Sequence, residues 1–444
     1  MDKFVIKGGK PLHGETNVSG AKNVALKALI AACLTDEEVI INNIPFISDF
    51  MTMVDIIRDL GGNINLDNHT ARIQIKKFKK NEISLDVAAR IRTSSMFLAP
   101  LLVRTGEAIV PNPGGCRLGA RPIDRIIEGL NKMGAHIVYR SEDGYFHAKS
   151  QSLHGTTYRF KKNTHTGTET LIIAAVLAEG KTILENAAAE PEIDELIDLL
   201  NNMGAKIKRT GSRTIEINGV EKLHGTTHTI CPDRNEIITM AIAAFVTKGD
   251  IFIKDIESNH INEFLEKVQD AGGGFEEKDQ GVRFFYKQPF RAVDVVTSFY
   301  PGFMTDWQAP WAVLMTQANG ISVIHETVFE DKFGYISDLK KMGANTRLFN
   351  PLVDDPEKVY NFNRADDHPD YFHAVKIKGP TKLHNAVSTM VDLRAGAAIV
   401  LAALAAKGTS TIFGIEKLDR GYESFEKRLL SLGANIKRVT VSDL

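Results

Sequence analysis

The chain has 444 residues, of which 43% are hydrophobic and 25% charged, as in an ordinary globular protein. Its 54 basic and 55 acidic residues leave a formal net charge of −1, which argues against a nucleic-acid or membrane surface built on bulk charge. The length predicts two or three domains.

Cysteine usage and hydropathy indicate the compartment. The three cysteines, Cys33, Cys116 and Cys231, are too few, and odd in number, for a disulfide framework. The first 15 residues have no apolar segment of the secretory type. The longest apolar stretch, 395–406, is too short to cross a bilayer core of about 30 Å. We therefore expect a cytoplasmic protein with no membrane partner.

A short glycine motif recurs six times along the chain. Each copy follows an amphipathic run such as 193–200, so the glycine predicts a helix C-terminus where the backbone needs a positive φ. The central glycines are Gly61, Gly134, Gly204, Gly272, Gly343 and Gly433, spaced 73, 70, 68, 71 and 90 residues apart. Such regular spacing predicts six repeated structural units.

A second helical segment in each unit is apolar on nearly all sides, as at 171–178 and 397–404. Such a helix is buried on all sides, and a β-rich run such as 181–186 follows it. We therefore expect an α/β fold of two inside-out barrel domains. Each would contain three units with buried inner helices and outer sheets. The first domain would span 22–231, and the second would combine 1–21 with 232–444.

The last interval between glycines is longer by about 20 residues, and the excess maps to 349–373. This stretch is rich in Asp, Asn, Pro and aromatic residues, which predicts an inserted surface loop. Its carboxylates and histidines are types that bind divalent ions. Their spacing fits no metal-binding pattern, so we favour a solvated loop and predict no metal and no cofactor. The residues concerned are Asp366, Asp367, His368, Asp370 and His373.

Residues 111–124 form the most informative segment, and their prolines and glycines predict a loop. Cys116 lies there between Gly115 and Arg117, where a thiol should be accessible and its thiolate favoured by the nearby cation. Taken alone, these residues also fit an inert thiol in a surface turn.

This loop resembles the catalytic loop of the UDP-N-acetylglucosamine enolpyruvyl transferases. The resemblance covers nearly the whole chain, because further motifs at 19–23, 300–306 and 419–423 follow in the family's order. It implies the same two inside-out barrels. It also implies transfer of the enolpyruvyl group of phosphoenolpyruvate to the 3′-hydroxyl of UDP-N-acetylglucosamine by addition and elimination, with release of phosphate. That reaction is the first committed step of peptidoglycan synthesis, on which cell shape and division depend, and fosfomycin inhibits it.

The resemblance also assigns the groups that act on phosphoenolpyruvate. Cys116 would donate a proton and Asp306 would act as base, with Lys22 and Arg394 also catalytic. A single arginine is more often a solvated surface charge. Several guanidinium groups that converge on one place, however, can bind a phosphate and a carboxylate in bidentate fashion. Asp306 could also cap the helix that follows it. The cations around the anion would be Lys22, Arg92, Arg121, Arg394 and Arg420.

Residues for the nucleotide sugar follow from the same resemblance. Asn23 would hydrogen-bond the sugar side, Val328 would contact the ribose or sugar, and Lys162 through His165 would meet the diphosphate. The family usually has Ser-Val-Gly in that segment, whereas this chain has Thr164, His165 and Thr166. The uracil would be framed by Arg121, Pro122, Ile123 and Asp124.

Two alternatives stay open from the sequence. One is a divergent enolpyruvyl transferase that acts on another nucleotide sugar, and the other is a non-catalytic protein that binds a UDP-sugar. The related shikimate-pathway transferase is disfavoured because it lacks the Gly-Gly-Cys loop. The sequence does not set the oligomeric state, and a monomer is compatible with it.

Overall fold

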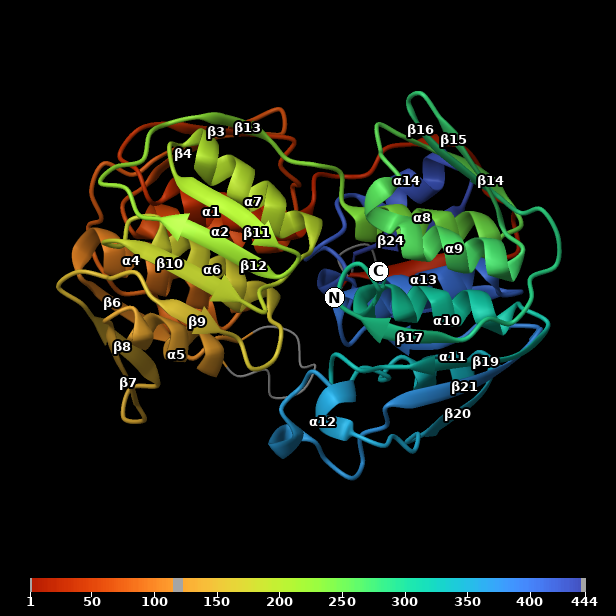
Figure 1. Cartoon of the computed structure of the whole chain (residues 1–444). Coiled ribbons are helices and arrows are strands. Elements are labelled where there is room, and N and C mark those ends of the chain that lie inside the picture. Colours follow the sequence, from red (N-terminus) through yellow and green to blue (C-terminus); the bar gives the residue numbers. More distant parts are fainter. Residues whose placement is uncertain (1, 115–122, 441–444) are drawn as a thin grey trace. The chain divides into compact units, whose positions relative to one another are not determined.

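The computed structural model describes residues 2–114 and 123–440. The chain divides into two compact units, and it crosses between them at Ser19/Gly20 and at Cys231/Pro232. The first unit contains the described residues of 20–231, and the second contains 2–19 with 232–440 (Figure 1).

Three sheets and the helices that pack against them make up the described part of the first unit. The sheet orders are β13-β3-β5-β4, β6-β8-β7 and β11-β12-β10-β9. The strands are β3 (Val39–Asn42), β4 (Asn63–Asp67), β5 (Thr70–Gln74), β6 (Glu107–Pro111), β7 (His136–Arg140), β8 (Tyr145–Lys149), β9 (Thr157–Arg159), β10 (Lys181–Glu185), β11 (Lys206–Gly211), β12 (Thr214–Asn218) and β13 (Thr227–Thr229). The helices are α1 (Lys22–Ala32), α2 (Ser48–Asp59), α3 (Leu85–Ala88), η1 (Arg92–Phe97), α4 (Leu98–Thr105), α5 (Asp124–Lys132), α6 (His165–Ala175) and α7 (Pro191–Asn202).

The second unit repeats this plan with sheets β22-β23-β1-β24, β15-β16-β14-β2 and β18-β17-β19-β21-β20. Strand β1 pairs with strands from the far end of the sequence, since Phe4 lies opposite both Ile412 and Arg438. The strands are β1 (Lys3–Lys7), β2 (His13–Thr16), β14 (Asp250–Lys254), β15 (Gly274–Lys278), β16 (Gly281–Phe285), β17 (Val295–Ser298), β18 (Phe303–Met304), β19 (Gly320–His325), β20 (Asn345–Phe349), β21 (Ala374–Gly379), β22 (Val387–Thr389), β23 (Thr409–Phe413) and β24 (Asn435–Val439). The helices are α8 (Arg234–Val246), η2 (Asn259–Ile261), α9 (Asn262–Ala271), η3 (Thr305–Trp307), α10 (Gln308–Thr316), α11 (Ile336–Lys341), α12 (Pro356–Val359), η4 (Arg364–Asp366), α13 (Leu393–Ala405), η5 (Ile415–Lys417) and α14 (Phe425–Ser431).

The repeated glycines end helices, as the motif predicts. All six have a positive φ between 85° and 99°, and each follows the end of an amphipathic helix. A side chain is strained in this conformation, so glycine is the natural residue there. The six repeats and the inside-out α/β architecture predicted from the sequence are confirmed.

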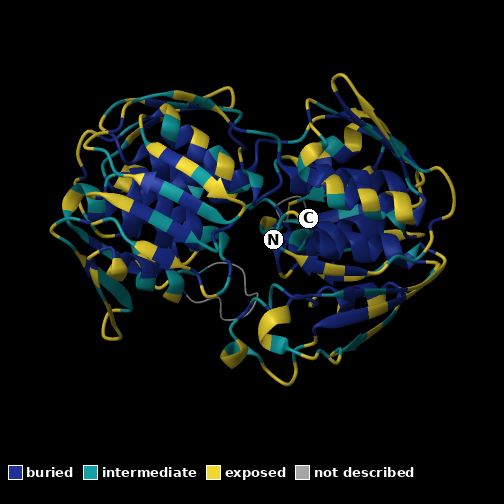
Figure 2. Ribbon diagram, viewed as in Figure 1, coloured by how far each residue is buried: buried dark blue, intermediate teal, exposed yellow. Residues whose placement is uncertain are grey.

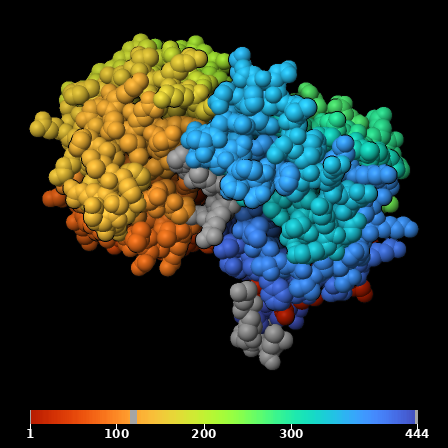
Figure 3. Space-filling view, turned by 90° about the horizontal axis from the view of Figure 1, so that it is seen from below, coloured from red at the N-terminus to blue at the C-terminus, as the bar shows by residue number. Residues whose placement is uncertain are grey.

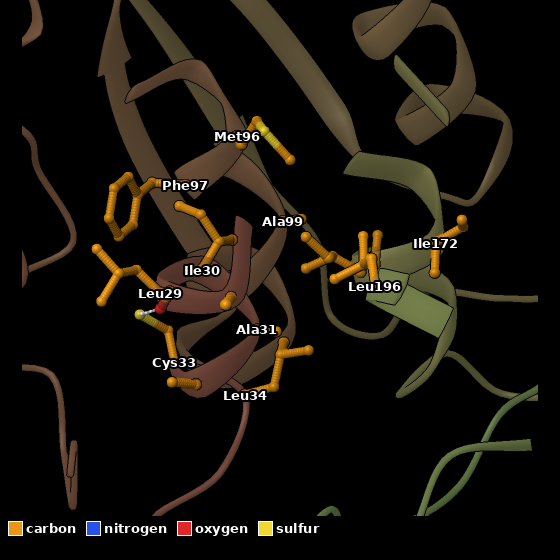
Figure 4. Packing of buried hydrophobic residues seen from close by; sticks show 14 of the residues in the cluster. Leu29, Ile30, Ala31, Cys33, Leu34, Met96, Phe97, Ala99, Ile172 and Leu196 are labelled. Carbon is orange, nitrogen blue, oxygen red and sulfur yellow. Dashed lines mark hydrogen bonds between the residues drawn. The ribbon is translucent and has the colours of Figure 1, made fainter. Parts of the chain in front are cut away.

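The inner helices form the core of each unit. In the second unit α8, α10 and α13 pack against one another, and every residue of α8 is buried (Figure 2). In the first unit Cys33 lies just beyond α1 among apolar side chains such as Phe97, and its thiol donates to the carbonyl of Leu29 at 3.2 Å (Figure 4). Burial raises the pKa of the Cys33 thiol well above its usual value. This cysteine is therefore structural.

The excess residues 349–373 leave the end of β20 and return to the start of β21, and they contain the short elements α12 and η4. They lie at the surface of the second unit, light blue in Figure 3. His373 is buried against Asp367 at 3.2 Å and stacks near Tyr360 and Phe362, so an aromatic cluster anchors the loop to the sheet.

Candidate active site

Lys22 is the first residue of the buried helix α1 in the first unit. Its ammonium group donates to Asp49 at 2.6 Å, and both side chains are largely buried, at 12% and 7% exposure. Asp49 lies in the first turn of α2, where the helix dipole favours a negative charge. The carboxylate thus fixes the direction of the lysine, and the N-terminus of α1 adds positive potential beside it.

Four other predicted residues of the first unit lie at or beside helix starts. Asn23 follows Lys22 in α1, and Arg92 begins η1, and both are partly buried. Ile123 is buried at the N-cap position of α5, and Asp124 is exposed in the first turn of that helix.

The segment predicted to meet a diphosphate leads into α6. Lys162 is partly buried in the loop before it, and the hydroxyl of Thr164 caps the helix by accepting from the backbone N–H of Gly167 at 3.2 Å. His165 is the first residue of α6, and its Nδ1 lies 3.4 Å from the buried carboxylate of Glu169. A helix N-terminus with a basic side chain suits an anion.

Asp306 lies within the 3₁₀ turn η3 of the second unit, just before the inner helix α10. Its oxygens lie 3.5 Å from Lys332 Nζ and 3.4 Å from Arg394 Nε. Burial disfavours the charged carboxylate, but the two cations outweigh this effect and hold the pKa of Asp306 below its usual value. The side chain retains 28% exposure, so an ionised acceptor is accessible there.

The alternative that Asp306 caps the following helix is wrong. The N-cap residue of α10 is Trp307, and no side chain makes the cap hydrogen bond. The turn η3 places Asp306 one residue too early, so its carboxylate points instead to Lys332 and Arg394.

Arg394 is held in place by its own helix and by an aromatic ring. It lies in the first turn of α13, whose N-cap residue Asp392 accepts from the backbone N–H groups of Arg394 and Ala395 at 2.9 and 3.0 Å. Its guanidinium lies over the ring of Tyr422, 5.2 Å from the centroid, and Tyr422 in turn hydrogen-bonds Thr239 at 2.8 Å. The guanidinium of Arg394 is therefore buried but stabilised by its neighbours. Burial disfavours its charged form, but Tyr422 and Asp306 outweigh this effect and raise the pKa of Arg394.

A buried carboxylate organises the loop that contains Val328. Glu326 accepts from the backbone N–H groups of Val328 and Phe329 at 2.8 and 3.0 Å. Its other oxygen accepts from Thr305 Oγ1 at 2.8 Å and from Gln308 Nε2 at 2.9 Å. One side chain thus joins this loop to the turn that bears Asp306.

The sequence reasoning missed Lys332 and Glu326. Nothing in their local pattern marks them, because a lone lysine and a lone glutamate after a strand usually face solvent. Both are buried, at 6% and 0% exposure, and their burial is the signal that identifies them. Arg420 was predicted, and it is partly buried in the turn after η5.

Comparison with known proteins identifies the family. The sequence profile of EPSP synthase (3-phosphoshikimate 1-carboxyvinyltransferase) matches residues 6–429. The chain belongs to the EPSP synthase family. It is 42% identical over 443 residues to a UDP-N-acetylglucosamine 1-carboxyvinyltransferase of Koribacter versatilis, covering 99% of this chain and 97% of that one. It is 41% identical to a protein of the same name from Acidobacterium capsulatum, covering 99% and 96% of the two chains.

Solved structures of two other proteins show the same fold. The enolpyruvyl transferase NikO of Streptomyces tendae has a TM-score of 0.85 at 24% identity, with 99% of each chain covered. An EPSP synthase of Acinetobacter baumannii has a TM-score of 0.73 at 17% identity, covering 99% of this chain and all of that one.

Three predicted residues of this family member, Cys116, Arg121 and Pro122, lie outside the described residues. Among the residues that are described, none form a group of three or more His, Cys, Asp or Glu side chains that could hold a metal ion. No helix in that part of the chain is both long and apolar enough to cross a membrane.

Proposed function

We propose that this protein transfers the enolpyruvyl group of phosphoenolpyruvate to the 3′-hydroxyl of UDP-N-acetylglucosamine and releases phosphate. The supporting observation is identity of 40–42% over 99% of the chain with several proteins named for this activity. The reaction would be the first committed step of peptidoglycan synthesis. The cytoplasmic location expected from the sequence stays a prediction.

The second unit supplies chemistry that suits this reaction. The sugar oxygen attacks C2 of phosphoenolpyruvate while C3 gains a proton, and a tetrahedral ketal forms. Loss of a proton from C3 then expels phosphate. Asp306 is ionised and partly exposed, so it can accept the proton of the hydroxyl. Cys116 is our candidate for the donor to C3.

The anion would be held by lysine and arginine side chains. Lys332 and Arg394 place two positive charges around the single carboxylate of Asp306, which leaves positive charge for phosphate or carboxylate oxygens. An anion bound to these cations would weaken their effect on Asp306, whose pKa would rise and make it a stronger base. We also assign Lys22 and Arg92 of the first unit, and Arg420 of the second unit, to the binding of phosphoenolpyruvate.

The nucleotide sugar would be bound by the remaining predicted residues. They are Asn23, Arg121, Pro122, Ile123, Asp124, Lys162, Thr164, His165 and Val328. The described members of this set from the first unit lie at or beside the starts of α1, α5 and α6, where backbone N–H groups are available to an anionic ligand.

The test is phosphate release from phosphoenolpyruvate with and without UDP-N-acetylglucosamine, followed by the mass of the nucleotide product. We expect release only with the acceptor, and a product heavier by one enolpyruvyl group. Turnover with a different nucleotide sugar alone would support the divergent transferase. Binding of UDP-N-acetylglucosamine by a folded protein with no turnover of any acceptor would support the non-catalytic alternative.

A further inference from the structure

Three ionisable side chains lie together among the otherwise apolar inner helices of the first unit. Lys27 of α1 is 5% exposed and Glu169 of α6 is fully buried, and both face His165 at the start of α6. Burying such groups is costly unless they are paired, so their presence requires an explanation. The hydrophobic core around them is built mainly from Ile, Ala and Leu side chains.

The two basic side chains both approach the carboxylate of Glu169. Lys27 Nζ lies 3.3 Å and His165 Nδ1 lies 3.4 Å from the same oxygen of Glu169, Oε2. The carboxylate is one helical turn beyond the histidine, so it faces one edge of the imidazole ring. The histidine side chain keeps 25% exposure, and it therefore still reaches the surface at the N-terminal end of α6.

Electrostatics favours the imidazolium at this place. The charged groups acting on His165 are Glu169 of its own helix, Lys27 of α1 and Glu190 at the N-cap of α7. Burial and Lys27 disfavour the cation, but the two carboxylates outweigh them and raise the pKa of His165. A neutral imidazole carries a single N–H and can donate from only one nitrogen, whereas the imidazolium donates from both.

We propose that Glu169, which pairs with Lys27, is a positioning residue that holds the His165 imidazole as a hydrogen-bond donor to the diphosphate of the nucleotide sugar. The proposal rests on the proposed function, which places the diphosphate at this segment. Glu169 orients the ring and favours its charged form, and Lys27 pairs with the same buried carboxylate at 3.3 Å. Affinity for the nucleotide sugar should then fall as pH rises through the pKa of His165.

The experiment uses the full chain and UDP-N-acetylglucosamine, with Kd measured by calorimetry at about pH 6 and about pH 8. His165→Asn should bind about tenfold more weakly, the usual cost of losing a hydrogen bond to a charged group, and should lose the pH dependence. Glu169→Gln should be about tenfold weaker at the higher pH and closer to the wild type at the lower pH. Adding Glu169→Gln to His165→Asn should weaken binding no further, because both act through one ring.

Lys27→Met should shift the pH dependence of binding in the opposite direction from Glu169→Gln. Removing a nearby positive charge raises the pKa of His165 further, so tight binding should persist to higher pH. Asp143→Asn is the matched control, since Asp143 pairs with His147 four residues away at 2.7 Å on an exposed turn of the same unit. It should bind as the wild type does. The KM for phosphoenolpyruvate should also be unchanged in Asp143→Asn.

The titration of the His165 ring, followed by NMR in wild type and Glu169→Gln, supplies a readout independent of activity. Its pKa should fall in Glu169→Gln. Unchanged Kd in His165→Asn, or a pH dependence that survives in it, would overturn the proposal while leaving the proposed function intact. His165→Asn decides the matter even if Glu169→Gln does not fold. A folded wild type that fails to bind UDP-N-acetylglucosamine would overturn both.

Discussion

Lys332 Nζ lies 3.5 Å from Asp306 Oδ1, and the two residues are 26 positions apart in the chain. The lysine side chain is 4% exposed and the aspartate 28%, so the cation is buried beneath a carboxylate that solvent and substrate can reach. This pair and Arg394 determine how the carboxylate ionises.

Replacing Lys332 with Met should move the acid limb of the kcat/KM profile to higher pH. The pKa of Asp306 is held below its usual value, so removing one cation raises it, and activity that needs the carboxylate is lost at a higher pH. Lys341→Met is the matched control, because Lys341 pairs with Asp338 at 3.0 Å in the same unit. An acid limb at the same pH in both variants would mean that Lys332 does not act on the base.

Asp306→Asn should lower kcat by about 10²–10⁴-fold with little change in the Kd of UDP-N-acetylglucosamine, because the amide keeps the shape but cannot accept the hydroxyl proton. Asp294→Asn is the control, since Asp294 is exposed in the same unit and accepts from the backbone N–H of Val323 at 2.7 Å. A loss in Asp306→Asn below about threefold would contradict its assignment as base.

Glu326→Gln should destabilise the folded protein by about 1–3 kcal/mol. Both oxygens of Glu326 accept hydrogen bonds, whereas the amide nitrogen of glutamine cannot accept and would leave its neighbouring donors unsatisfied. Thermal unfolding would measure the loss. Hydrogen exchange should show faster exchange at Val328 and Phe329, whose N–H groups bond Glu326. Glu276→Gln is the control, because Glu276 is exposed and pairs with Arg283 at 3.0 Å. This substitution should change neither thermal unfolding nor hydrogen exchange at Val328 and Phe329.

Cys116→Asp should retain some activity and become insensitive to fosfomycin, whereas Cys116→Ser should lose proton delivery and keep UDP-sugar binding. The physical reason is that a carboxyl group can donate a proton but offers no thiolate for alkylation. In the wild type Cys33 should stay unmodified until the chain unfolds, because it is buried with its thiol pKa raised. Peptide mapping after inhibitor treatment would check both statements, and an unchanged fosfomycin response in Cys116→Asp would place the reactive thiol elsewhere.

The architecture can be predicted from local features of the sequence. Glycines such as Gly204 and Gly343 need a positive φ at helix ends. The runs 171–178 and 397–404 are apolar on nearly all sides and can only be buried, so local conformation and patterning specify the repeat. Those requirements act within about twenty residues of chain and are therefore visible in the sequence. The family motifs at Lys22, Asp306 and Arg394 are local in the same sense.

The environment of the candidate site depends on how distant parts of the chain pack together. Whether Asp306 caps a helix depends on one residue of register in η3, and whether Lys332 is a solvated charge depends on burial beneath a carboxylate far along the chain. The same holds for Lys27, which reaches Glu169 and its helical neighbour His165 only because α1 and α6 pack together. Desolvation and charge–charge interaction act through space over a few ångströms, so only packing brings such groups close enough to change their ionisation.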